Sequence, residues 1–257
     1  MILMALAVLS GALVGFSLGL VGGGGSILAT PLLLYVVGVN EPHIAIGTSA
    51  LAVSINAYLN FLSYIRTGAV RWRSGIIFAL IGSIGALAGS TLGKALDANR
   101  LLFLFGILML IVGLLMLRPR RPKAMQPDST KPRSLLQIAV AFCVGITSGF
   151  FGIGGGFLIV PGLVFSTGMP ILNAIASSLL AVGSFGLTTA VNYAVSGLVD
   201  WPVAVEFIAG GLVGGLGGIS LAGKLAGRKN ALNIAFATLI FMVAAYVLYR
   251  SGRTLLT

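Results

Sequence analysis

Two glycine-rich segments are the parts of this 257-residue sequence best suited to chemistry. GLVGGGGSILATP covers 19–31, and GFFGIGGGFLIVP covers 149–161. Glycine in a helix costs about 1 kcal/mol relative to alanine, so each cluster should break an apolar helix. The short helix that restarts after such a break, at Ser26 in the first copy, presents N–H groups without internal partners at its positive dipole end. Each segment therefore predicts a bend where an oxyanion could bind.

Other glycines have a simpler interpretation. Small residues at every fourth position let membrane helices approach one another closely. We assign this packing role to the spaced glycines, which are Gly11, Gly15, Gly19, Gly82, Gly85, Gly89, Gly145, Gly149, Gly211, Gly214 and Gly218. Packing rarely requires adjacent glycines that destroy a helix, so the contiguous clusters are interpreted as a site.

Hydroxyl groups near the clusters complete the predicted binding site. They could donate to an anion, or bond to a carbonyl one turn back in their own helix. The predicted substrate-binding residues are Gly22, Gly23, Gly24, Gly25, Ser26, Thr48, Ser49, Gly152, Gly154, Gly155, Gly156, Ser177 and Ser178. The deep amides of Asn56, Asn60 and Asn192 are expected to join helices, and any that faces the cavity becomes a candidate.

Titratable groups are scarce in this sequence. Glu206 and His43 are candidates for binding a proton or a coupling cation. Glu206 also suits the first turn of a helix, and His43 suits a solvated loop. The sequence contains no HExxH pattern and no nucleophile elbow, and Cys143 is its only cysteine. We therefore expect no enzymatic activity, no cofactor and no metal site.

The composition indicates which elements must hold these residues. Hydrophobic residues make up 58% of the chain and charged residues 8%, with a mean hydropathy of +1.08, whereas soluble domains carry roughly 25% charge. The long apolar runs lack the alternation of barrel strands, so the sequence predicts an all-α polytopic membrane protein. The net charge of +11 comes from cations near the ends of apolar segments, so we expect no nucleic-acid partner.

The sequence contains an internal duplication. Between 15 and 38, nine of 24 residues recur 130 positions later, and between 44 and 72, ten of 29 recur 129 positions later. Aligned glycine, proline and tryptophan residues make this match specific. We therefore predict a first transmembrane repeat at 1–117, a basic proline-rich linker at 118–134 and a second transmembrane repeat at 135–257.

Each repeat is predicted to contain five hydrophobic elements. They cover 3–21, 26–39, 44–65, 75–95 and 101–117, then 135–151, 156–168, 172–195, 203–223 and 231–249. A membrane span needs about 20 apolar residues, so 26–39 and 156–168 are expected to be half-helices that form hairpins with the elements before them. This gives about eight spanning helices and two short broken helices.

An odd number of elements places the second repeat upside down relative to the first. If the linker is cytoplasmic, 12 of the 16 Lys and Arg residues lie inside. Inverted repeats with broken helices are typical of secondary transporters, whose sites lie at the breaks. Four parallel crossings per repeat are the alternative, which explains the basic loop at 224–229 less well.

The doubled glycine motif, followed in the first repeat by IGTSALAVSINAYLNFLSYIRTGAVRWR, resembles the TauE/SafE family of membrane transporters, also called sulfite exporters. The resemblance covers nearly the whole chain outside the linker. It implies a multi-pass carrier of the bacterial or archaeal inner membrane for sulfite, sulfoacetate or another organosulfonate, with the anion held at 22–26 and 152–156. The second copy differs, because Ile153 replaces Gly23 and Gly156 replaces Ser26, so the site is expected to be asymmetric.

The expected function is export of a small sulfur-containing anion by alternating access. Transport of another small anion, a metabolite or a metal ion by the same fold is the alternative, and a membrane enzyme or scaffold is the competing class. A cation site would need buried carboxylates or thioethers, which are scarce here. The expected partners are the anion and the lipid bilayer, and the oligomeric state is left open, with a homodimer among the options.

Overall fold

The computed structural model describes residues 2–117, 134–152, 156–224 and 229–256, and its secondary structure is helical throughout these ranges. In the first repeat the elements are α1 (Ile2–Val21), η1 (Gly22–Leu28), α2 (Ala29–Leu32), η2 (Leu33–Val37), α3 (Pro42–Ile65), α4 (Trp72–Ala95) and α5 (Ala98–Leu117). In the second they are α6 (Ser134–Phe151), α7 (Gly156–Thr167), α8 (Ile171–Val195), α9 (Trp201–Lys224) and α10 (Lys229–Leu256). The predicted all-α fold is confirmed.

Five of the described helices are long and apolar enough to cross a membrane. They are Ile2–Leu20, Pro42–Ile65, Trp72–Ala95, Ile171–Val195 and Trp201–Leu221. Shorter apolar helices cover Gly22–Val37, Ala98–Leu114, Leu135–Phe151 and Gly156–Thr167. The two predicted half-helices, 26–39 and 156–168, both fall in this shorter class.

Glycines in left-handed conformation end the same elements in both repeats. The described residues with positive φ are three pairs of glycines, Gly22 with Gly152, Gly38 with Gly168, and Gly68 with Gly197. Members of each pair are 129 or 130 residues apart, which is the spacing of the duplication. Only glycine adopts this conformation readily. The internal repeat is therefore present in the backbone as well as in the sequence.

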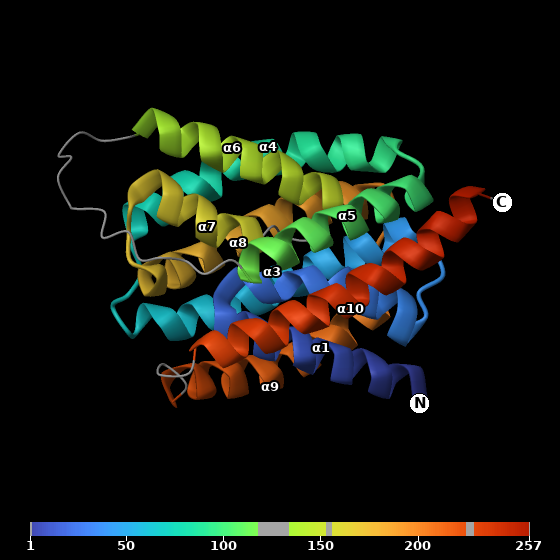
Figure 1. Cartoon of the computed structure of the whole chain (residues 1–257), viewed down its shortest axis with the longest axis horizontal. Coiled ribbons are helices and arrows are strands. Elements are labelled where there is room, and N and C mark those ends of the chain that lie inside the picture. The colour runs from blue at the N-terminus through green and yellow to red at the C-terminus, as the bar shows by residue number, and fades with distance from the viewer. Residues whose placement is uncertain (1, 118–133, 153–155, 225–228, 257) are drawn as a thin grey trace.

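Helices of one repeat pack mainly against helices of the other. α1 packs on α9, and its counterpart α6 packs on α4. The counterparts α3 and α8 pack together, as do α5 and α10. In Figure 1, α1 and α9 lie along one edge, α4 and α6 along the opposite edge, and the remaining pairs between them. The repeats are thus interlocked.

The spaced glycines form the helix contacts, as the sequence predicted. A Cβ added at Gly15 of α1 would overlap the backbone of Gly211 in α9. At the equivalent contact, a Cβ at Gly145 of α6 would overlap the backbone of Gly82 in α4. Such overlaps show that the helix backbones are in direct contact, which only small residues permit.

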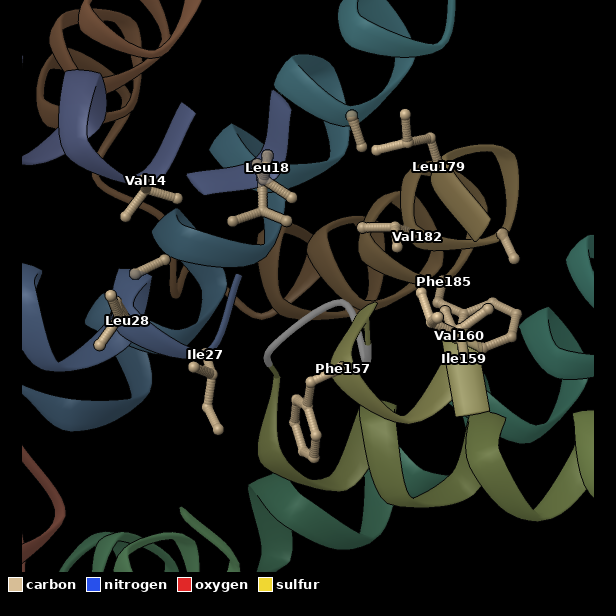
Figure 2. Packing of buried hydrophobic residues seen from close by; sticks show 14 of the residues in the cluster. Val14, Leu18, Ile27, Leu28, Phe157, Ile159, Val160, Leu179, Val182 and Phe185 are labelled. Atoms are coloured by element: carbon tan, nitrogen blue, oxygen red, sulfur yellow. The ribbon is translucent and has the colours of Figure 1, made fainter. Parts of the chain in front are cut away.

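The chain direction agrees with two inverted repeats. The N- and C-terminal ends are at one end of the molecule, while α5 ends and α6 begins toward the other (Figure 1). Buried apolar side chains from both repeats form one core, in which Ile27 and Phe157 occupy equivalent positions (Figure 2). The linker at 118–133 lies outside the described residues.

Candidate anion site

The two glycine segments meet in the interior of the protein. A Cβ added at Gly23 would overlap the backbone of Gly156, and a Cβ added at Gly156 would overlap the backbone of Gly23. Both residues are buried. The bends of the two repeats are therefore in direct backbone contact, and their described residues are closed against each other.

Matched contacts across the repeats position the two bends. Gly22 ends α1 with a φ of 72° and lies against Ile175 of α8, where an added Cβ would be 2.8 Å from Cγ2. Gly152 ends α6 with a φ of 66° and lies against Ile46 of α3. Ile46 and Ile175 are themselves equivalent residues of the duplication. Each bend is thus held by the other repeat.

The first bend differs from the sequence prediction in one respect. We expected a helix to begin after the glycines, at Ser26, but a 3₁₀ helix begins at Gly22 and includes the whole cluster. Glycine has no side chain to crowd this tight helix, in which side chains three residues apart eclipse one another. The Ser26 hydroxyl donates to the carbonyl oxygen of Gly23 at 2.9 Å, which fixes the turn.

Of the remaining glycines of the predicted site, the structure describes two and leaves two outside the described residues. Gly24 and Gly25 are buried within the 3₁₀ helix, and a Cβ at Gly25 would be 2.5 Å from the backbone nitrogen of Leu18. This contact folds the bend back on α1. Gly154 and Gly155 lie outside the described residues. α7 begins at Gly156, as predicted.

The four predicted hydroxyl residues of α3 and α8 make matched hydrogen bonds. Thr48 Oγ1 accepts from the backbone N–H of Asp200 at 2.9 Å, and Ser177 Oγ accepts from the backbone N–H of Arg71 at 2.8 Å. Ser49 and Ser178 donate to carbonyls three residues back in their own helices. Ser49 also shares a 2.8 Å hydrogen bond with Thr30. These contacts have structural roles, and binding by these residues stays a prediction.

Glu206 lines a cavity of about 380 Å³ at the end of the molecule where α3 and α9 begin. Glu41 and Asp200 line it too, so three of the chain's five acidic residues face one space. His43 is partly buried nearby in sequence, and its Nδ1 has no hydrogen-bond partner among the described residues. Among the residues that the structure describes, no group of three or more His, Cys, Asp or Glu residues is arranged to hold a metal ion.

The deep amides divide into two kinds. Asn192 joins helices as expected, because its Nδ2 donates to Ser90 Oγ at 2.7 Å and its Oδ1 accepts from Lys94 Nζ at 2.9 Å. Asn56 is 1% exposed, yet neither its Oδ1 nor its Nδ2 has a partner among the described residues. The sequence located Asn56 but could not show that its amide is unpaired.

Taken together, these features define a helical membrane protein of two interlocked repeats with broken helices that meet inside it. The chain belongs to the sulfite exporter TauE/SafE family, whose family model matches residues 7–247. It is 58% identical over 248 residues to a probable membrane transporter protein of Xylella fastidiosa, covering 96% of this chain and 95% of the relative. It is 29% identical to the probable membrane transporter protein YunE of Bacillus subtilis, covering 94% and 96%. No solved structure matches the chain significantly.

Proposed function

We propose that the chain exports a small sulfur-containing anion, such as sulfite or an organosulfonate, across the inner membrane by alternating access. Family membership supports transport. The observation that supports the proposed site is the contact between Gly23 and Gly156, which brings bends from two opposed repeats together. Backbone N–H groups at such bends can hold an oxyanion without a basic side chain.

The electrical gradient favours export in this proposal. A monovalent anion that leaves an inside-negative cell gains about 2.3 kcal/mol per 100 mV. Export therefore needs no coupling ion. The basic residues of the loop at 66–73 and of the linker support a cytoplasmic location for these segments under the positive-inside rule.

One observation favours a second candidate, cation-coupled uptake. The cavity lined by Glu41, Asp200 and Glu206 has the negative charge that a cation or a proton would use. This cavity is at the end opposite the one toward which α5 ends and α6 begins (Figure 1), and it is the outer side if the linker is cytoplasmic. Uptake through this route would depend on the carboxylates, whereas uncoupled export would not.

Sulfite flux in proteoliposomes tests the proposal. The wild-type chain should release radiolabelled sulfite, and Gly23→Ala and Gly156→Ala should each reduce release by at least about tenfold, since misplacing a bound group by about 1 Å has effects of this size. Gly217→Ala is the control, because a Cβ there would be 3.7 Å from its nearest neighbour. Normal flux in both bend variants would refute the site, and no wild-type flux would refute the substrate.

A further inference from the structure

Two buried amides on α3 have polar atoms with no partner in the described part of the chain. Asn56 is 1% exposed and both of its amide atoms are unpaired. Asn60 is 5% exposed and its Nδ2 is unpaired. A buried polar group without a partner bears the full penalty of losing its water.

The two amides face one seam of the helix bundle. Positions four apart lie on the same face of a helix, so Asn56, Asn60 and Tyr64 form a line along α3. A Cβ added at Gly211 of α9 would overlap the Asn56 amide, and one at Gly215 would overlap the Asn60 amide. Tyr64 reaches α1, where it donates to the Gly19 carbonyl at 3.0 Å. The amides therefore lie where α1, α3 and α9 converge.

At the position equivalent to Asn56, the second repeat shows that the fold does not require a polar side chain. Phe185 is the counterpart of Asn56, and its ring lies over Gly82 as the Asn56 amide lies over Gly211. Phe185 is fully buried and belongs to the apolar core (Figure 2). An aromatic side chain can thus fill this position, and the amide in the first repeat calls for another explanation.

We infer that Asn56 and Asn60 contact the substrate in this seam, and that the substrate is a monoanion carrying both an oxyanion and a hydrogen-bond donor. This inference rests on the proposed function and assigns specificity within it. An amide N–H can donate to a sulfonate or sulfite oxygen, and the amide oxygen needs an O–H or N–H donor. Neutral amides suit a single negative charge, since burying a second charge is costlier.

The seam is closed in the described conformation, so the substrate enters when α9 separates from α3. The contacts that α9 presents here are Gly211 and Gly215, which have no side chains to interlock with α3. A smooth glycine face lets one helix move against another. Sulfate, which has acceptor oxygens and no donor as a dianion, would leave the Asn56 oxygen unpaired and should be rejected.

A matched pair of sulfonates tests the inference on the full-length chain. We would measure proteoliposome flux and melting temperature in detergent with 2-hydroxyethanesulfonate and with ethanesulfonate, which lacks the hydroxyl. The wild type should prefer the hydroxylated compound by about tenfold or more, since sites built to bond a hydroxyl discriminate strongly against its absence. Only the hydroxylated compound should raise the wild-type melting temperature appreciably.

The variant Asn56→Leu should lose this preference and the ligand-induced melting shift, while its own melting temperature stays level or rises. The control is Thr189→Val at the position equivalent to Asn60, where the hydroxyl is also buried and unpaired among the described residues. It should keep both responses. A preserved preference in Asn56→Leu, as expected if the amide only holds a water molecule, would overturn the inference. Wild-type transport of sulfite without any response to either sulfonate would also overturn it, while leaving the proposed function standing.

Discussion

Thr48 accepts a hydrogen bond at 2.9 Å from the backbone N–H of Asp200, although the two residues belong to different repeats. The equivalent bond joins Ser177 to Arg71 at 2.8 Å. Asp200 and Arg71 immediately precede α9 and α4, so each hydroxyl fixes the start of a helix from the other repeat. The same device therefore operates twice, once at each end of the molecule.

Removing this hydroxyl should destabilise the protein. Thr48→Val leaves the Asp200 N–H without its acceptor, and we expect a loss of about 1 kcal/mol in unfolding free energy. Adding Ser177→Ala should about double the loss, because the two sites are independent. Thr188→Val is the control, since that hydroxyl bonds only within its own helix. Thermal melting in detergent measures the effect, and a raised KM for sulfite in Thr48→Val would instead favour direct substrate contact.

Close packing of α4 on α6 should make Gly89 intolerant of a side chain. A Cβ at Gly89 would overlap the Ile146 carbonyl, and overpacking typically costs about 1–3 kcal/mol. Gly75 is on the same helix, but a Cβ added there would be 3.5 Å from its nearest neighbouring atom. Gly75→Ala should therefore be neutral or stabilising by up to about 1 kcal/mol. Equal melting temperatures for the two variants would contradict the helix contact.

Inversion of the repeats predicts that equivalent loops face opposite sides of the membrane. Thr67 and Ser196 are 129 residues apart and both are exposed. In a Cys143→Ser background, Ser196→Cys should react with an impermeant maleimide in intact cells. Thr67→Cys should react only after the membrane is opened. Labelling of both positions from the same side would rule out inversion.

Uncoupled export predicts that the acidic cavity is dispensable for flux. Glu206→Gln removes one of the three carboxylates that line this cavity. We expect sulfite release from proteoliposomes to change by less than about twofold, and to keep its dependence on pH, because no proton accompanies the anion. His43→Gln provides a second test of the same point. A collapse of flux, or a shifted pH profile, would favour the coupled alternative.

Much of the fold could be predicted from the sequence because local patterns determine it. Apolar runs predicted eight of the ten elements to within three residues at each end, while α10 extends to Leu256 rather than to 249. The spaced glycines identified the helix contacts because only small residues permit backbone contact. The start of the first half-helix was misplaced, since the glycine penalty in an α-helix does not apply to a buried 3₁₀ turn.

The site was harder to predict because it depends on contacts between repeats. The sequence indicated that Gly23 and Gly156 belong to one site, but not that their backbones touch. Lys94 donates to the Asn192 carbonyl at 2.8 Å and to Ser196 Oγ at 2.8 Å, and these contacts were not identified from the sequence. Partners so distant in the chain leave no local signal.

The interlocking of the repeats has a consequence for biogenesis. α1 leaves the ribosome early, but its glycine face is complementary to α9, which is synthesised near the end of the chain. Until α9 is synthesised, the glycine face of α1 has no packing partner in the bilayer. A ribosome that stalls in the linker would therefore release a fragment unable to complete its own packing, and such a fragment should be a ready target for membrane proteases.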